Sequence, residues 1–333
     1  LALEWGRGTL PGMAAKTQRI GPFPFGMDNR APDFKMALPK DTGGHLLRDA
    51  FNVDVTPQGT LKSRAGYALA LAGADSHSAF DSDGVALYCD AGNVYRLELS
   101  GDQVERSLVA SGYGALAPVR YARVNEAIYF TDGVRVGSYH PVSGPTPSWS
   151  DAAATTVGDQ ALVPMPPGSC IAHHGARLLV AVGSVLVYSE PFLPHLRDPA
   201  RGFEMFPAPI TCIAAVEGGV FVLADKTYFI AGGFPAQEVR AALPYGGPAQ
   251  QAGYRDDGGA HWMSARGLCS CDKQGALVNL QEQHVAMAVT GSAATLFREA
   301  DGMRAVVAAL SEPSSSAAGV GSYAQARIVR KDP

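Results

Sequence analysis

Charged residues are scarce in this chain of 333 residues, where Asp, Glu, Lys and Arg together make up 17%, against about 25% in average soluble domains. The net charge is −4, and no run of Lys and Arg is longer than Arg330–Lys331. Nucleic-acid binding depends on clustered basic side chains that neutralise phosphates, so tight nucleic-acid binding is not expected. A surface with so few charges is easier to explain if other subunits cover part of it.

Cysteines are also few, and their spacing does not form a pattern. The five are Cys89, Cys170, Cys212, Cys269 and Cys271. Most of them lie inside apolar, strand-like runs, which favours buried and reduced thiols that act as small hydrophobic residues. The Cys-Ser-Cys segment at 269–271 has no partner pair at zinc-site spacing, so no metal site is predicted.

Long hydrophobic runs are missing as well. The longest apolar stretches, such as Leu178–Tyr188, are interrupted by glycine and serine, whereas a membrane-spanning helix needs about 20 apolar residues. The N-terminus also lacks a basic segment followed by an apolar one, so no signal peptide is expected. Met13 begins a plausible translation start, and residues 1–12 are therefore expected not to be native.

The sequence is rich in turn formers and in core material. It contains 38 glycines, 23 prolines and 47% hydrophobic residues. In a chain this apolar, such a composition is typical of many tight turns between short strands.

A weak repeat of short strand, apolar strand, tight turn and further strand occurs five times. In the first copy, Val85–Cys89 and Val94–Leu99 flank the turn Ala91–Asn93. The later turns are expected at Asp132-Gly133, Gly183-Ser184, Asp225-Lys226 and Gln274-Gly275, the last after a first strand at Trp262-Met263 and a second at Gly267–Cys269. Successive turns lie roughly 40–50 residues apart, which is the period of four-stranded propeller blades.

This repeat predicts an all-β protein, with a six-bladed β-propeller over residues 46–333. Several strands are apolar on both faces, as strands between stacked blades should be. Strands near 295–297, 303–309 and 325–329 are expected to share the sixth blade with an N-terminal hairpin at 51–63, because such sharing leaves no exposed sheet edge. Residues 1–45 are predicted to form an extended N-terminal arm, and residues 311–318 a flexible loop.

No motif for catalysis, cofactor binding or metal binding rises above background, and we predict no such residue and no enzymatic activity. Gly112–Ala117 resembles a dinucleotide loop, but Pro118 follows at once and leaves no helix N-terminus for a pyrophosphate. Gly319–Ala324 lacks the preceding strand and the following helix. Asp81–Gly84 and Asp256–Gly259 lack the later acidic ligands of a calcium loop and are interpreted as β-turns.

Other polar residues are assigned ordinary roles. The pair His173-His174 at a strand end is expected to serve a turn or a hydrogen bond rather than a metal. Four further charged residues, expected to be solvated hairpin residues, are Arg123, Glu126, Arg177 and Arg266. An axial cluster of acids from several blades, as in propeller enzymes, is not visible from sequence alone.

Two segments resemble bacteriophage and prophage structural proteins. Leu47–Tyr67 contains Arg48-Asp49-Ala50, then Asn52-Val53-Asp54, a Gly59 turn and Arg64-Ala65-Gly66-Tyr67, which is similar to the opening of many such chains. Val124–Gly133 is similar to their blade hairpins.

The resemblance implies a virion protein of the tail hub or nozzle type, localised in the tail after synthesis in the bacterial host. It implies a homo-oligomeric ring, commonly a hexamer, that contacts other tail or adaptor proteins, with DNA only passing non-specifically through a channel. No catalytic residue is carried over. The alternatives are a receptor-binding or fibre-attachment propeller of the virion, a carbohydrate-active propeller enzyme with two carboxylates facing each other across the axis, and a cellular scaffold.

Overall fold

The structure, a computed structural model, divides the chain into two compact units, Leu1–Arg64 and Ala65–Pro333. It describes residues 21–23, 25–32, 35–37, 43–49, 53–56, 58–63, 69–101, 103–146, 149, 154–157, 159–236, 238–286, 289, 291–300, 303–311 and 324–330. These residues form β-strands and no α-helix. The prediction of an all-β protein is confirmed. None of the described segments is a helix long and apolar enough to cross a membrane.

The first unit contains one short hairpin. Strand β1 (Val53–Val55) pairs antiparallel with β2 (Leu61–Ser63). The N–H of Gly59 donates to Thr56 O at 2.8 Å and closes the turn, and Gly59 O accepts from Phe23 N at 2.6 Å. The hairpin therefore belongs to the unit that ends at Arg64, and the unit boundary falls later in the chain than the predicted boundary after residue 45.

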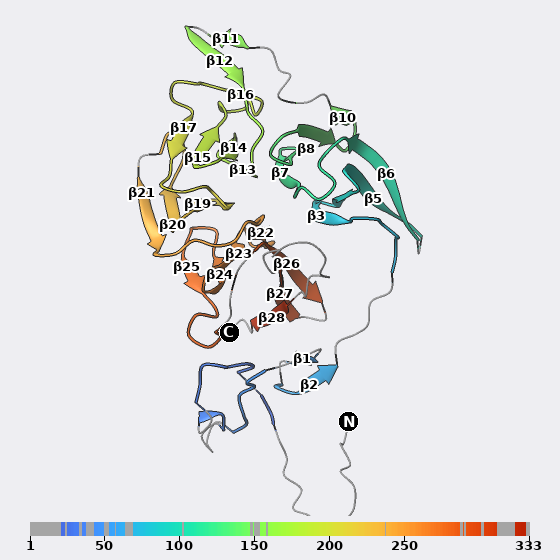
Figure 1. The fold of residues 1–333 in the computed structure, drawn as a ribbon, viewed down its shortest axis with the longest axis vertical. Helices are drawn as coiled ribbons and strands as arrows, with labels where there is room; N and C mark the ends of the chain where they lie inside the picture. Colours follow the sequence, from blue (N-terminus) through green and yellow to red (C-terminus); the bar gives the residue numbers. More distant parts are fainter. Residues whose placement is uncertain are drawn as a thin grey trace, which may run out of the picture. The chain divides into compact units, whose positions relative to one another are not determined.

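The second unit contains six main antiparallel sheets, which follow one another in chain order (Figure 1). The first sheet is β3 (His77–Ser82), β4 (Val85–Asp90), β5 (Asn93–Ser100) and β6 (Gln103–Ser111); the second is β7 (Arg120–Val124), β8 (Ala127–Thr131), β9 (Val136–His140) and β10 (Gly144–Thr146). The third is β13 (Cys170–His174), β14 (Arg177–Val182), β15 (Val185–Tyr188) and β17 (Phe203–Met205); the fourth is β18 (Cys212–Val216), β19 (Gly219–Leu223), β20 (Thr227–Ala231) and β21 (Val239–Leu243). The fifth is β22 (Gly253–Tyr254), β23 (Ala260–Ser264), β24 (Gly267–Cys271) and β25 (Leu277–Asn279); the sixth is β26 (Ala293–Ala300), β27 (Met303–Leu310) and β28 (Ala324–Arg330).

A small additional sheet combines two strands that lie between the second and third sheets in the chain with one strand from the connection between β15 and β17. It consists of β11 (Thr155–Val157), β12 (Gln160–Pro164) and β16 (Leu196–Arg197). The buried carboxylate of Asp198 fixes the end of this sheet, because it accepts hydrogen bonds from Gln160 Nε2 at 2.7 Å and from Arg201 Nε at 3.0 Å.

Tight turns explain why these segments form hairpins. Between β4 and β5, Ala91 and Gly92 both have positive φ angles, 48° and 75°. Two successive positive φ values produce the turn whose twist matches that of antiparallel strands. A Cβ on Gly92 would also lie 2.5 Å from Tyr113 O, so both the backbone angle and the available space require glycine there.

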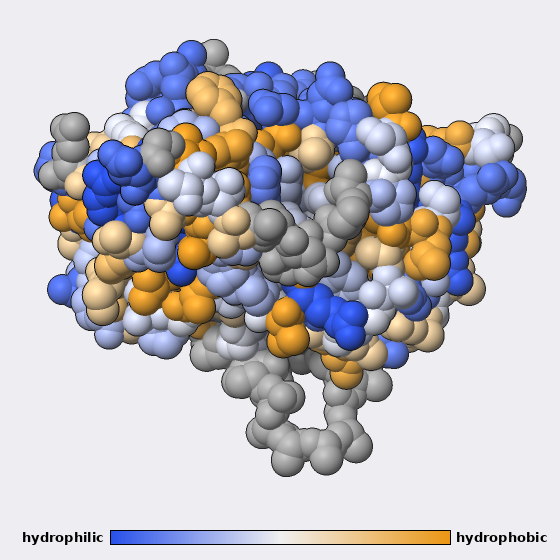
Figure 2. Space-filling model, turned by 90° about the horizontal axis from the view of Figure 1, so that it is seen from above, coloured by the Kyte–Doolittle hydropathy of each residue, from blue (hydrophilic) through white to orange (hydrophobic). Residues whose placement is uncertain are grey.

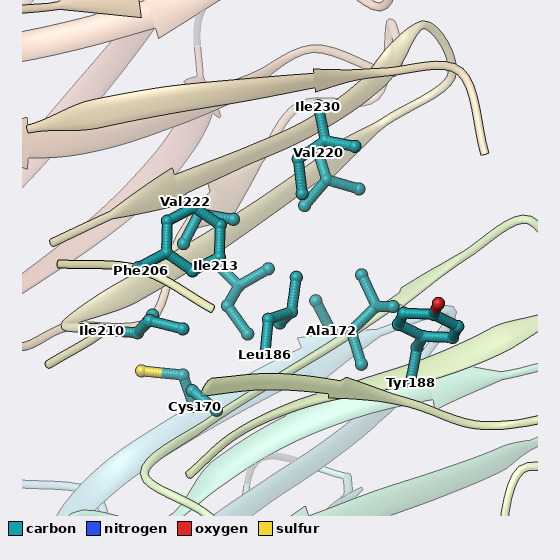
Figure 3. Close-up of a cluster of buried hydrophobic side chains, with 12 residues drawn as sticks. Cys170, Ala172, Leu186, Tyr188, Phe206, Ile210, Ile213, Val220, Val222 and Ile230 are labelled. Atoms are coloured by element: carbon teal, nitrogen blue, oxygen red, sulfur yellow. The ribbon is translucent and has the colours of Figure 1, made fainter. Parts of the chain in front are cut away.

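Five apolar clusters fill the spaces between successive main sheets. In order, they pack Leu87 against Phe130, Val124 against Leu178, Leu186 against Ile213, Phe221 against Trp262, and Met263 against Val306. Figure 3 shows the third of these clusters, in which Leu186, Ala172 and Tyr188 face Ile213, Val220 and Ile230 of the fourth sheet. Each sheet thus buries one or both faces against its chain neighbours, which is how stacked sheets remove apolar area from water.

One sequence prediction differs from this arrangement. The fifth copy of the repeat was placed one strand too late, because its first strand is β22 and the segment containing Trp262 is the second strand. A strand of two residues leaves no periodicity in the sequence, so the pattern could not show it.

A second prediction concerns the termini. Among the described residues, β1 pairs only with β2, and β26, β27 and β28 form a sheet of their own. Because β1 and β2 belong to the first unit and β26, β27 and β28 to the second, the predicted sharing of one blade by both termini stays a prediction. A three-residue hairpin carries no sequence information about which sheet it joins. The predictions for Met13, for residues 1–12 and for most of the loop at 311–318 lie outside the described residues.

Candidate functional site at the first strands

In each of the six main sheets, we call the strand that comes first in the sequence the first strand; these are β3, β7, β13, β18, β22 and β26. The first strands lie near one another in a series. Strand β3 lies next to β7, β7 next to β13, β13 next to β18, and β22 next to β26. The fifth sheet is reached from β18 through β23, which lies next to both β18 and β26. Two hydrogen bonds add a link to the segment that contains β22, because Gln250 N donates to Thr211 O at 3.1 Å and Ala215 N donates to Tyr254 Oη at 3.2 Å. Polar groups on these strands are the natural place to look for a site shared by all six sheets.

A glutamine before β22 bridges two sheets that are distant in the chain. The side-chain oxygen of Gln251 accepts a hydrogen bond from Tyr121 N at 2.9 Å, and its side-chain nitrogen donates to Tyr121 O, also at 2.9 Å. This pair of bonds is what a neighbouring strand would make with β7. The side chain thus joins the second sheet to the fifth.

The preceding glutamine holds the other side of the same segment. Gln250 is fully buried, and its amide accepts from Met263 N at 2.8 Å and donates to Met263 O at 2.6 Å and to Pro248 O at 3.2 Å. Consecutive residues of an extended segment point to opposite sides. Gln250 and Gln251 therefore attach one short segment to β23 on one side and to β7 on the other.

Thiols and one cation lie at the beginnings of β7, β13 and β18. Burial raises the pKa of Cys170 and raises that of Cys212 well above its ordinary value, while Arg120 opposes both shifts. The Nε atom of Arg120 is buried without a hydrogen-bond partner in the described part of the chain. Thiols with raised pKa values are protonated at neutral pH and poorly nucleophilic, so this group does not form a reactive cysteine centre.

All five cysteines are buried and free, as the sequence indicated. Burial also raises the pKa of Cys269 to about 12 and that of Cys271 to about 11. Within the described residues, no three His, Cys, Asp or Glu side chains gather closely enough to hold a metal ion.

The histidines of the first and second strands are not grouped into a site. His174 bonds to Gly232 O at 2.6 Å through Nε2, while Nε2 of His173 is buried without a partner. His261 is fully buried with both ring nitrogens unpartnered, and burial, with a smaller effect from Arg255, lowers its pKa to about 4. A histidine with this pKa is neutral at pH 7 and contributes to packing.

The motifs considered from sequence occupy turns and loops. Asp81–Gly84 spans the β3–β4 turn, where Asp83 and Gly84 have φ angles of 48° and 75°. Asp257 accepts hydrogen bonds from Gly259 N at 2.9 Å and from Arg255 Nε at 3.0 Å in the β22–β23 turn. The loop at 112–117 connects β6 to β7 with no helix after it. The second glycine-rich segment, 319–324, falls almost wholly outside the described residues.

The four charged residues singled out from sequence are each paired locally. Arg123 donates to Ser82 O at 2.9 Å, and Arg177 donates to Ser189 O at 2.5 Å. The other two pairs are Arg266 with Glu282 at 2.9 Å and His140 with Glu126 at 3.2 Å. Arg123 and Glu126 lie on the β7–β8 hairpin of the second sheet, Arg177 on the third sheet and Arg266 on the fifth, and each has a different partner.

Sequence reasoning missed Gln250 and Gln251, the residues that connect the first strands. Two adjacent glutamines after Pro248-Ala249 match no binding motif, and their partners are backbone groups, which leave no mark in the sequence. Correct placement of β22 as a first strand would have directed attention to them.

No family model matches the chain, and no curated protein matches it either. Among solved structures, it is similar to the extracellular domain of the putative hybrid two component system BT4673 from B. thetaiotaomicron, with 10% identity and a TM-score of 0.42, over 68% of this chain and 30% of that chain. A second structure, of the extracellular domain of the putative one component system BT4673, gives 8% identity and a TM-score of 0.42 over 69% of this chain. The computationally designed Ika8 protein gives 8% identity and a TM-score of 0.40, over 73% of this chain and 83% of that chain. The chain spans 30% and 31% of the length of the two BT4673 structures.

Proposed function

We propose that the six main sheets are the blades of a six-bladed β-propeller and that the chain is a structural, non-catalytic subunit of a bacteriophage tail, of the hub or nozzle type. The single observation that supports the propeller architecture is the pair of hydrogen bonds between Gln251 and Tyr121. The proposed role in a phage tail is supported by the resemblance of Leu47–Tyr67 and Val124–Gly133 to phage structural proteins.

The Gln251–Tyr121 bonds require that the stack of sheets curves. Three sheet interfaces separate the second sheet from the fifth, and packed sheets lie about 10 Å apart. A straight stack would therefore place these sheets roughly 30 Å apart, whereas the side-chain amide of Gln251 meets Tyr121 at 2.9 Å. A curved stack with the first strands innermost, as in a propeller, satisfies this distance.

The outward faces of the terminal sheets support closure of the ring. Val94 packs against the second sheet, so Leu99, an odd number of residues along β5, lies on the opposite face and is 82% exposed. On β26, Phe297 packs against the fifth sheet, and Leu296 on the other face is 62% exposed. These are the faces that would meet when the first and last blades of a propeller come together.

A scaffolding role fits the chemistry of the first strands. Of the first strands, β7, β13, β18 and β22 carry no carboxylate, and β3 and β26 carry one each, Asp81 and Glu299, whereas a glycosidase needs an opposed pair of them. The segment at 250–254 makes hydrogen bonds to β7, β18 and β23 and so links these three strands. Any DNA conduit would then lie between subunits of a ring rather than along the axis of one subunit.

Exposed apolar side chains are available for contacts between subunits. Val142 is 87% exposed, Phe192 80% and Met205 72%. Figure 2 shows apolar residues interspersed with polar ones over the face in view. Such mixed surfaces are typical of interfaces whose core is assembled from separate apolar anchors within a polar rim.

The proposal is tested by mass spectrometry of tryptic peptides from density-gradient-purified phage particles of the source strain, combined with electron microscopy of the purified protein. We expect peptides of this chain in intact particles at a few to a dozen copies, and ring-shaped oligomers of the protein. If the chain is absent from intact particles, the virion assignment is wrong. Glycan binding and hydrolysis assays then become the next measurement.

A further inference from the structure

A pocket lies between the outer part of the first sheet and the second sheet, away from the first strands. Its volume is about 320 Å³, and its apolar wall comes from Val109, Phe130, Val136 and Pro145. Small-molecule pockets usually begin near 300 Å³, so this one has room for a compact ligand. Neither the phage resemblance nor the proposed propeller assigns it a role.

Two glycines create the space. A Cβ on Gly137 would lie 2.5 Å from Phe130 Cε2 and 2.6 Å from Tyr113 Oη, and Gly137 has no positive φ that would itself require glycine. A Cβ on Gly112 would lie 3.0 Å from Nη1 of Arg135. The side chains of Tyr113 and Arg135 therefore extend over bare backbone and reach the same pocket.

Tyr113 presents an unused hydrogen-bond donor. The residue is 8% exposed and lines the pocket, yet its hydroxyl makes no hydrogen bond with any part of the chain that the structure describes. Burial, reinforced by the nearby Asp132, raises the pKa of Tyr113, so the hydroxyl keeps its proton at neutral pH. The hydroxyl is therefore free to donate a hydrogen bond to a ligand that enters the pocket.

Arg135 presents an unpaired positive charge. Its guanidinium has no hydrogen bond or ion pair within the described segments, although the carboxylate of Asp132 is close in sequence. Asp132 is instead engaged by backbone groups, because it accepts from Arg135 N at 2.7 Å, Val134 N at 2.9 Å and Gly114 N at 3.0 Å. The cation therefore remains available for an anion that enters the pocket.

We propose that this pocket binds a small carboxylate carried by a compact apolar group, with Arg135 pairing with the anion and the Tyr113 hydroxyl donating a hydrogen bond to it. Arginine and a carboxylate form the stronger, charge-assisted type of hydrogen bond. The wall of Val109, Phe130, Val136 and Pro145 would cover the apolar part. A neutral ligand of the same shape would leave Arg135 unpaired and bind more weakly.

The test uses fluorine NMR of the full chain with para-fluorobenzoate and its neutral analogue para-fluorobenzamide, at concentrations up to about 10 mM. We expect the carboxylate to bind at least about tenfold more tightly than the amide. The variant Arg135→Gln should abolish this preference, and Tyr113→Phe should weaken carboxylate binding about threefold to tenfold. Because neither side-chain polar group has a partner to lose, both variants should unfold at the temperature of the unmodified chain.

The matched control is Arg298→Gln, which removes an exposed arginine from β26 of the sixth sheet and should leave binding unchanged. Equal binding of carboxylate and amide, or a preference that survives Arg135→Gln, would overturn the proposal. So would the absence of any binding of para-fluorobenzoate in this range. The result is independent of the virion assignment, because it requires neither particles nor rings.

Discussion

The middle and the terminal sheets of the second unit are made from the same hairpins but differ in burial. All five residues of β19 in the fourth sheet are buried, whereas most of β6 in the first sheet is exposed. The fourth sheet has a neighbour on each face, and the first and sixth sheets each have an apolar cluster on one face only among the described residues. The contribution of a strand to stability thus depends on its neighbours more than on its own sequence.

The largest expected loss of stability follows from a substitution in the fourth sheet, in the middle of the stack. Leu223 of β19 is fully buried between the fourth and fifth sheets, and Leu223→Ala should lower the free energy of unfolding by about 3–5 kcal/mol, because it leaves a cavity. The measurement is urea unfolding followed by circular dichroism. Leu99→Ala, on the exposed hairpin of the first sheet, is the control and should change stability by less than about 0.5 kcal/mol. Similar losses for the two variants would contradict the comparison.

The next effect concerns the interface between the fifth and sixth sheets. His261 is fully buried there, with its pKa lowered by burial to about 4 from an ordinary 6.5. The unfolded chain takes up a proton that the folded chain does not, so this stability is complete above pH 6.5 and falls by about 3 kcal/mol as the pH drops from about 6.5 to 4. His261→Phe should flatten the pH dependence of urea unfolding in this window. An unchanged slope would mean that water reaches the terminal interface.

The two glutamines come third. Gln250→Ala should cost about 1–3 kcal/mol, since it leaves the buried N–H and C=O of Met263 without their side-chain partner. Gln251→Ala should cost less, about 1 kcal/mol, because Gln251 is only part-buried and so are its hydrogen bonds to Tyr121. Both are measured by urea unfolding against Gln103→Ala, an exposed position on β6. A larger loss for Gln251 than for Gln250 would show that the bridge between the second and fifth sheets dominates.

The smallest expected change in stability tests whether the first and sixth sheets meet and close the ring. If the first and sixth sheets meet, Leu296→Asp places a charge in an apolar interface and should cost about 1–2 kcal/mol. Differential scanning calorimetry with Leu296→Ala as the matched variant separates loss of apolar area from the added charge. A change within about 0.5 kcal/mol for Leu296→Asp would instead show that this face stays in water.

Much of the fold could be predicted from sequence because hairpins are local. The turns at Ala91-Gly92, Asp132-Gly133 and Gly183-Ser184 carry their own positive-φ residues, and the apolar strands beside them need no distant information. The register of the fifth copy could not be predicted in this way. Its first strand is two residues long and is held by Gln250, whose partners are backbone atoms of β23.

The pocket also could not be predicted from the sequence. It depends on the missing Cβ atoms of Gly112 and Gly137, and in a chain with 38 glycines neither position is distinctive. Nothing in the sequence distinguishes Arg135 from other arginines, and only the structure shows that the carboxylate of Asp132 accepts hydrogen bonds from backbone N–H groups and leaves the guanidinium of Arg135 unpaired.

The bridge between Gln251 and Tyr121 also has a consequence for synthesis of the chain. It joins residues 130 positions apart, so it cannot form until the ribosome has made the third and fourth sheets and the segment that follows them. The hairpins can pair locally as they emerge, whereas this contact must close a long loop, for which the entropic cost grows with loop length. A nascent chain that stops before residue 251 would therefore contain paired hairpins, but its second sheet would lack the hydrogen bonds that Gln251 makes to Tyr121 in the complete chain.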